Sequence, residues 1–108
     1  MSGMILIYVV CKDAIEAKNI GKKILKKKLI ACVNILDGMK SMYFWPPGGD
    51  KIEESSETIL LVKTIKEKFS EINEEIHKMH SYELPCIFSI KVDEVDSKYQ
   101  KWLSDQIK

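Results

Sequence analysis

The sequence contains no arginine, and its 17 basic residues, all lysine, are almost balanced by 16 acidic residues to a net charge of +1. Arginine is the side chain that most often reads base edges and grips phosphates through two parallel hydrogen bonds. A nearly neutral chain also lacks the positive field that draws proteins to nucleic acid or to acidic membranes. We therefore expect no nucleic acid among the partners of this protein.

Long apolar runs are missing as well. The longest, residues 4–10, is far too short to cross a bilayer. No segment combines the basic start, apolar middle and small-residue cleavage site of a signal peptide. We expect no membrane association and take the cytoplasm as the default location.

Cysteine is scarce, and its pattern does not suggest disulfide pairing. Cys11, Cys32 and Cys86 are odd in number and share no CxxC spacing. A disulfide framework is therefore not expected, which again favours a reducing compartment.

The sequence alternates predicted apolar strands with predicted amphipathic helices. Asp13 can cap the first helix, with Glu16 three residues on in a capping-box relation. Gly38 predicts a bend or bulge between two extended segments. We expect strands at residues 4–11, 30–37 with 39–45, a third long strand ending with 58–65, and 86–92, and helices after residue 13, at 67–80 and at 97–107.

Helical spacing also predicts which side chains face inward. The expected inward positions are Ala17, Ile20, Gly21, Ile24 and Leu25 of the first helix, Phe69, Ile72, Ile76 and Met79 of the second, and Tyr99, Trp102, Leu103 and Gln106 of the third.

This order of elements predicts an α+β, ferredoxin-like split βαβ sandwich with a C-terminal helix. Right-handed crossovers would place two helices on one face of a four-stranded antiparallel sheet. We assign residues 4–108 to this single domain and interpret residues 1–3 as a start or expression remnant.

Two features do not suit a monomer. Residues 30–45, fully extended at roughly 3.3 Å per residue, would span about 50 Å, whereas a compact chain of this size has a radius of gyration of about 13 Å. The first and third strands are also apolar on both alternations, so the sheet face away from the helices needs a cover. An oligomer would satisfy both observations.

Five ordered motifs carry a family resemblance: Ala31-Cys-Val-Asn-Ile35, Ser41-x-Tyr-x-Trp45, Leu61-x-Lys-Thr64, His80-x-Tyr-Glu-x-Pro85 and Tyr99-x-x-Trp-Leu103. Together they resemble the CutA family of divalent-cation tolerance proteins over nearly the whole chain. The resemblance implies a ferredoxin-like fold, a homotrimer built through the long central strands, binding of divalent metals and copper especially, and no enzymatic activity. It also leaves open an alternative function, small-molecule sensing by a trimer like the PII signalling proteins.

Other functions of this fold have requirements that the sequence does not meet. A copper chaperone needs CxxC after the first strand, and an acylphosphatase-like enzyme needs an arginine-bearing phosphate loop. A PII-type nucleotide sensor needs a long flexible loop between the middle strands, where this chain has the short turn of residues 46–50. We predict that the protein is not an enzyme and requires no cofactor.

The candidate metal site centres on His80, at the end of the second helix. Imidazole and thiolate are ligands that Cu(II), Cu(I) and Zn(II) accept. We place Cys11, Cys32 and Cys86 at the same end of the sheet as His80 and take His80, Glu83, Cys11 and Cys86 as candidate ligands. Alternatively, His80 only caps its helix and the cysteines pack as small apolar residues.

A ligand cleft is expected at the boundary between subunits, because the resemblance places the trimer contacts beside the His80 segment. Its candidate wall residues are Tyr82, Lys63, Tyr43 and Trp45. The alternatives are interface or core packing for Tyr43 and Trp45, and a snorkelling position for Lys63. The side chains of His80, Tyr82 and Glu83 could instead cap the helix and bond within their own subunit.

Overall fold

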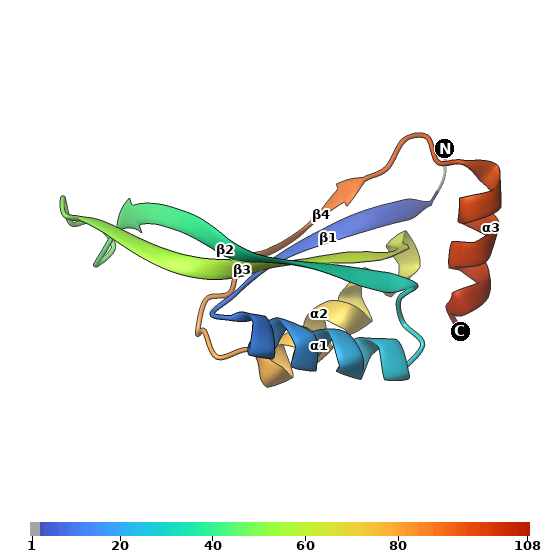
Figure 1. The fold of residues 1–108 in the computed structure, drawn as a ribbon, viewed down its shortest axis with the longest axis horizontal. Helices are drawn as coiled ribbons and strands as arrows, with labels where there is room; N and C mark the ends of the chain where they lie inside the picture. Colours follow the sequence, from blue (N-terminus) through green and yellow to red (C-terminus); the bar gives the residue numbers. More distant parts are fainter. Residues whose placement is uncertain (1–2) are drawn as a thin grey trace.

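Four antiparallel strands form one sheet in the order β2-β3-β1-β4 (Figure 1). The computed structural model describes residues 3–108. Its elements are β1 (Met4–Cys11), α1 (Ala14–Lys26), β2 (Cys32–Phe44), β3 (Ile52–Ile65), the 3₁₀ turn η1 (Lys66–Lys68), α2 (Phe69–Met79), β4 (Ile87–Lys91) and α3 (Ser97–Gln106). This is the predicted ferredoxin-like α+β fold, except that η1 replaces the expected first turn of the second helix.

Helix α1 begins and ends at residues with clear chemical reasons. The Asp13 side chain accepts a hydrogen bond from the Glu16 N–H at 2.8 Å, which satisfies one of the free donors at the helix start. At the other end Lys28 has a φ of 61°, and the Leu29 N–H donates back to the Ile24 carbonyl. This is the left-handed closure that commonly ends a helix.

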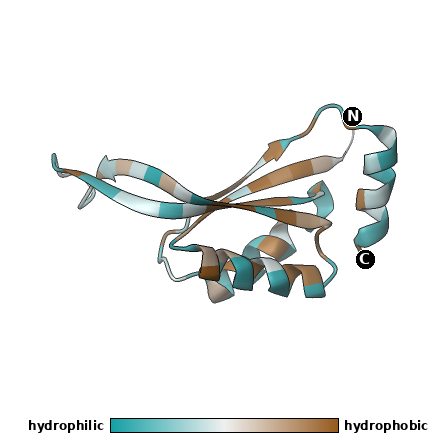
Figure 2. Ribbon diagram, in the orientation of Figure 1, coloured by the Kyte–Doolittle hydropathy of each residue, from teal (hydrophilic) through white to brown (hydrophobic). Residues whose placement is uncertain are grey.

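The main core lies between the two helices and one face of the sheet, where Figure 2 shows apolar residues on both layers. Side chains that alternate along the strands meet the apolar stripes of the helices. Fully buried members are Ile7 and Val9 of β1, Leu60 and Val62 of β3, Ile20 and Ile24 of α1, and Ile72 and Ile76 of α2. Truncating one of these isoleucines or leucines to alanine should cost about 2–5 kcal/mol.

Not every residue expected to face inward does so. Leu25 is 36% exposed and Trp102 is 43% exposed, and Gln106 is also exposed. Leu25 follows the buried Ile24 by one position, about 100° around the helix, so it falls beside the buried stripe. On α3 only one side is covered, and Leu103 is its buried residue.

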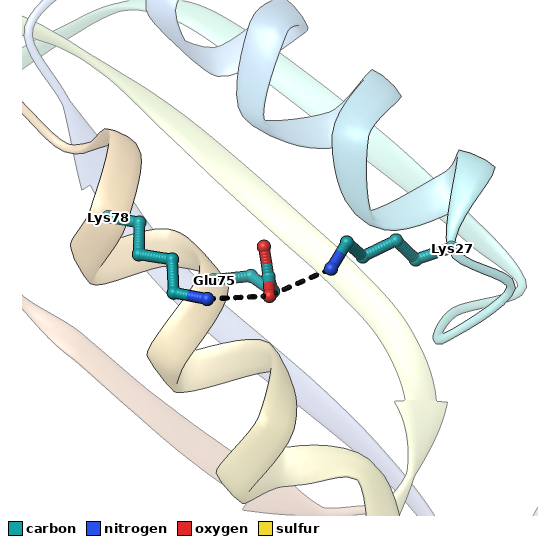
Figure 3. A network of polar contacts seen from close by, with 3 residues as sticks. All are labelled: Lys27, Glu75 and Lys78. Atoms are coloured by element: carbon teal, nitrogen blue, oxygen red, sulfur yellow. Dashed lines mark hydrogen bonds and ion pairs between the residues drawn. The ribbon is translucent and has the colours of Figure 1, made fainter.

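An ion-pair network ties α1 to α2 on the helical layer (Figure 3). The Lys27 ammonium, just after α1, lies 3.0 Å from Oε2 of Glu75, and the Lys78 ammonium lies 3.3 Å from the same oxygen. The Lys27 hydrogen bond, together with Lys78, lowers the pKa of Glu75. The network fixes the two helices side by side over the sheet.

The opposite face of the sheet is apolar, and beyond the end where α3 packs, no element within residues 3–108 covers it. Tyr8 of β1 stacks on Phe88 of β4 at a centroid distance of 4.8 Å. Phe88 is 44% exposed and Ile90 is 50% exposed. The prediction that the strands are apolar on both faces is confirmed.

The β2–β3 hairpin extends beyond the rest of the molecule, as predicted. Strand β1 ends where Cys11 pairs with Thr58, whereas β2 and β3 stay paired out to Phe44 and Ile52. The predicted irregularity at Gly38, whose φ is +79°, appears as a register shift between Leu36 and Met39. The chain measures 47 × 26 × 23 Å with a radius of gyration of 15.0 Å, and Figure 1 shows the hairpin projecting past both helices.

Helix α3 packs against the far end of the sheet and forms a second, smaller core. Its Leu103 is buried with Met4 and Ala31, and Tyr99 packs beside them. Within residues 3–108 no helix combines the length and apolar character needed to cross a membrane.

Candidate functional site

Three potential metal ligands converge where β1 ends, α1 begins and α2 ends. The structure places one ligand atom each from Cys11, Glu16 and His80 within 4.8 Å of one another. Cys11 is the last residue of β1, Glu16 lies in the first turn of α1, and His80 caps the C-terminus of α2. The chain reversals on either side of α1 and α2 therefore bring together residues that are far apart in the sequence. Glu16 and His80 are separated by 64 positions.

Glu16 is the member that the sequence analysis did not select as a ligand. Its Oε1 accepts from the Lys12 N–H at 2.9 Å and its Oε2 from the Ser81 N–H at 2.8 Å. Burial alone would raise the pKa of Glu16, but these backbone hydrogen bonds outweigh burial and lower it. A capping-box glutamate turns back toward the preceding strand, which is the signal that could have placed it beside Cys11.

Cys11 supplies a thiol that is fully buried. Burial, with the nearby negative charges of Glu16 and Asp13, raises the pKa of Cys11 to about 12. The thiol therefore keeps its proton at neutral pH, and a metal ion must displace that proton in order to bind sulfur.

His80 uses both of its ring nitrogens. Its Nε2 lies 2.7 Å from the Val10 carbonyl oxygen, which can only accept, so Nε2 carries the proton. Its Nδ1 accepts from the Tyr82 N–H at 3.1 Å. The ring is thereby fixed between β1 and the loop of residues 80–86 that connects α2 to β4, which we call the α2–β4 loop.

Tyr82 joins the α2–β4 loop to strand β3. Its hydroxyl donates to Oε2 of Glu57 at 2.6 Å, and its ring lies 4.9 Å from the His80 ring. Burial raises the pKa of Tyr82, and the hydrogen bond to Glu57 adds to the rise. Glu57 is only 9% exposed and pairs with Met39, directly after the register shift at the base of the projecting hairpin.

The donor set suits a borderline or soft divalent ion. One thiol, one carboxylate and one imidazole are ligands that zinc and copper both accept. Donors about 2.0–2.3 Å from one ion lie roughly 3.5 Å apart, so the present spacing requires only a small contraction. A surface cavity of about 330 Å³ lies beside the group and is lined by Glu16 and Ser81 among others, which gives an ion a route to the carboxylate.

Two other predicted ligands lie outside this group. Glu83 and Cys86 are exposed residues of the α2–β4 loop. The Cys86 carbonyl accepts from the Val10 N–H at 3.2 Å, so its backbone is close to the end of β1. Neither side chain belongs to the set of three donors that the structure brings together.

The prediction that Cys32 shares this end of the sheet is wrong. Strands β1 and β2 are both antiparallel to β3, so they run parallel to each other and start at the same end. Cys32 pairs with Lys63 near the start of β1, and its Sγ lies 3.8 Å from the Tyr99 hydroxyl of α3. A crossover through α1 necessarily returns the chain to the end where β1 began.

The other predicted cleft residues are spread along the sheet within one chain. The Lys63 ammonium lies 5.7 Å from the centre of the Tyr99 ring, at the α3 end. Tyr43 and Trp45 form an edge-to-face pair 6.5 Å apart on the projecting hairpin. Tyr82 lies between these two places, so a cleft that unites all four residues would need a neighbouring copy of the chain.

Comparisons with known proteins agree on one family. The sequence profile of the CutA1 divalent ion tolerance protein family matches residues 5–106. A divalent-cation tolerance protein CutA from Archaeoglobus fulgidus is 39% identical over 101 residues, which cover 94% of this chain and 95% of the relative. A protein of the same name from Thermotoga maritima is 38% identical over 104 residues, or 96% and 99% of the two chains.

Solved structures show the same relationship. The structure of the periplasmic divalent cation tolerance protein CutA from Archaeoglobus fulgidus matches with a TM-score of 0.90 at 37% identity, covering 97% of this chain and 99% of that chain.

Proposed function

The chain belongs to the CutA1 family of divalent ion tolerance proteins, and on that premise we propose that it binds a divalent metal ion through Cys11, Glu16 and His80 as part of tolerance to such ions. The observation that carries this proposal is the convergence of a sulfur, an oxygen and a nitrogen donor within 4.8 Å. Three protein ligands leave a position open for water or another small ligand.

Zinc and copper are the ions that this donor set suits best, and binding should be of weak to moderate affinity. The Cys11 thiol, whose pKa is raised to about 12, must release its proton. Both oxygens of Glu16 and both ring nitrogens of His80 already have hydrogen-bond partners. Each of these changes costs free energy and therefore lowers the affinity for the ion. A tolerance protein benefits from such an affinity because it can release the ion again.

We also propose that the protein acts as a homotrimer. The uncovered sheet face includes the exposed Phe88 and Ile90, and the hairpin exposes Phe44, Trp45 and Ile52 at 57%, 57% and 62%. An apolar surface of this extent is unusual on a monomer. The projecting strands also leave unpaired backbone groups that a neighbouring copy can bind. Light scattering at micromolar concentration should give three times the monomer mass, and a stable monomer would contradict the proposal.

The family name bears on catalysis, and the state of the cysteines bears on location. The family is named for tolerance to divalent ions rather than for a reaction, and we propose a binding function without catalysis. We keep the cytoplasm as the proposed compartment because Cys11, Cys32 and Cys86 are all free thiols.

Calorimetric titration with zinc tests the proposed site. His80→Ala should weaken zinc binding roughly tenfold or more, because even partners outside the direct ligand shell change metal affinity by about 10–100-fold. His77→Ala is the matched control, since His77 is an exposed histidine of the same helix. If both variants bind zinc like the unaltered protein, His80 is not a ligand.

Native mass spectrometry of protein purified without added metal separates the proposed function from its alternative. A trimer that retains zinc or copper supports the metal-binding function. A trimer that retains an organic molecule and takes up no metal supports the small-molecule sensor instead.

A further inference from the structure

The His80 ring has no free lone pair for a metal ion. A neutral imidazole carries one proton and one lone pair. Here the proton on Nε2 faces the Val10 carbonyl oxygen at 2.7 Å, and the lone pair on Nδ1 faces the Tyr82 N–H at 3.1 Å. Metal binding must therefore change at least one of these two hydrogen bonds.

The Tyr82 N–H loses its acceptor whichever nitrogen binds the ion. If Nδ1 coordinates, the ion takes the lone pair that now accepts from Tyr82. If Nε2 coordinates, the ring proton moves to Nδ1, and the Tyr82 N–H then faces a second donor. Both routes break the same hydrogen bond between His80 and the α2–β4 loop.

Glu16 behaves differently because a carboxylate has more lone pairs than its present partners use. Each of its oxygens accepts one backbone hydrogen bond, from Lys12 or from Ser81, and each oxygen has a second lone pair. Glu16 can therefore bind an ion and keep Ser81 in place. Within the α2–β4 loop, the hydrogen bond that a metal ion must break is therefore that of Tyr82, one residue further along.

Resting on the proposed metal site, we propose that metal binding releases Tyr82 from His80 and thereby loosens the attachment of the α2–β4 loop to the projecting β2–β3 hairpin. Tyr82 is attached at two points: its N–H to His80 and its hydroxyl to Glu57, at 2.6 Å. Moving the backbone at the first point displaces the hydroxyl at the second. Metal binding at Cys11, where β1 ends, thus changes the contacts at the base of the hairpin.

Glu57 lies where a displacement of the Tyr82 hydroxyl can affect the hairpin. It is 9% exposed and stands opposite Met39, where pairing resumes after the register shift of β2. Beyond it the hairpin has only its own two strands for support, since β1 has ended opposite Thr58. A change at Glu57 therefore acts on the segment that we propose as a contact between subunits.

Coupling of this kind is reciprocal. If zinc binding costs the Tyr82–Glu57 hydrogen bond, a protein that lacks this bond from the outset should bind zinc more tightly. Tyr82→Phe removes the hydroxyl and keeps the ring and the backbone N–H. The matched control is Tyr99→Phe, which removes a phenol on α3, at the other end of the sheet, and leaves Tyr82 and Glu57 unchanged.

The experiment measures amide hydrogen exchange by NMR in the full chain, with and without saturating zinc, in a background with Cys32→Ser and Cys86→Ser. The Tyr82 amide should exchange about three- to tenfold faster with zinc, the change that loss of one neutral hydrogen bond gives. The His80 amide, which donates to the Ile76 carbonyl at 2.8 Å, should not change. In calorimetry Tyr82→Phe should bind zinc about three- to tenfold more tightly, and Tyr99→Phe should bind as before.

The outcomes distinguish a failure of this coupling from a failure of the proposed metal site on which it rests. Zinc that binds without accelerating Tyr82 amide exchange, or without tighter binding by Tyr82→Phe, overturns the coupling and leaves the metal site standing. No zinc binding by the unaltered site overturns both.

Discussion

Each end of the sheet holds a cysteine among polar side chains, yet the two ends differ in what they can bind. At one end Cys11 lies with Glu16 and His80, within 4.8 Å of both. At the other, the Cys32 sulfur lies 3.8 Å from the Tyr99 hydroxyl, and the cation of Lys63 lies over the same ring. An ammonium group repels a metal ion, and within residues 3–108 only the first end presents a set of three suitable donors. The neighbours of a thiol, more than the thiol itself, decide its chemistry.

The difference arises from connectivity. The first end collects the start of α1 and the end of α2, which supply a capping carboxylate and a C-terminal histidine. The second end collects the end of α1 and the whole of α3, which supply lysines and aromatic rings. Acidic residues favour helix starts and cationic residues favour helix ends. The crossover topology therefore separates the two kinds of side chain.

Thiol alkylation should show the largest difference between the ends. A pKa raised to about 12 leaves roughly one Cys11 thiol in ten thousand ionised at pH 8, and the residue is fully buried as well. Iodoacetamide should modify Cys11 at least about a hundredfold more slowly than the half-buried Cys32. Peptide mapping by mass spectrometry measures both rates, and protein unfolded in urea gives the control in which the two react alike. Equal rates in the folded protein would remove the distinction.

Replacing Glu16 should destabilise the first end strongly. Glu16→Gln leaves one buried N–H, of Lys12 or Ser81, facing an amide NH₂, at a cost of about 1–3 kcal/mol in the free energy of unfolding. The exposed Glu74 on α2 supplies the control, Glu74→Gln, which should change it by less than about 0.5 kcal/mol.

The loss of stability in Glu16→Gln should depend on pH. Folding lowers the pKa of Glu16, so its stabilising effect is fully present above its unfolded pKa of about 4.3 and is lost as the pH falls through the folded value. Urea unfolding should therefore show a large difference in stability between the unaltered protein and Glu16→Gln at about pH 7 and a small one at about pH 2–3. A difference that does not shrink in acid would show that the carboxylate charge is not what holds the loop.

Much of this end could be predicted from the sequence, and the parts that could not have physical causes. Helical and strand periods predict the elements, and His80 and Cys11 stand out in the sequence because imidazole and thiol are metal ligands. The local sequence predicts only a capping role for Glu16, because its contact with Ser81 spans 65 positions and no local pattern encodes it. The predicted position of Cys32 is wrong because the crossover through α1 returns its strand to the end where β1 begins. Whether Glu83 and Cys86 take part in binding stays a prediction.

The two tyrosines give a matched pair of intermediate effect. Tyr82→Phe removes a 2.6 Å hydrogen bond to a carboxylate and should cost about 1–2 kcal/mol in the free energy of unfolding. Tyr99→Phe removes a 3.8 Å contact with sulfur and a hydrogen bond with the Lys63 side chain near the surface, and should cost less than about 1 kcal/mol. Thermal or urea unfolding distinguishes them, and equal costs would show that the hydroxyls are held equally at the two ends.

The smallest expected effect lies at the second end. Lys28, before β2, has a φ of 61°, a conformation that glycine adopts more readily. Lys28→Gly should stabilise the protein by about 0.5–1 kcal/mol without changing zinc affinity, because relief of a left-handed strain of about 1–2 kcal/mol exceeds the entropy that glycine adds to the unfolded chain. Lys22→Gly, within α1, should instead destabilise it by about 1 kcal/mol. A loss of stability in Lys28→Gly would mean that the lysine side chain contributes more than its backbone costs.

X-ray absorption at the zinc edge tests the metal site most directly, on protein loaded with one zinc ion per chain. The account predicts a first shell with one sulfur at about 2.3 Å and nitrogen or oxygen donors at about 2.0–2.1 Å, and loss of the sulfur in Cys11→Ser but not in Cys32→Ser. A shell without sulfur, or one whose sulfur survives Cys11→Ser, would contradict the assignment of the metal to Cys11, Glu16 and His80.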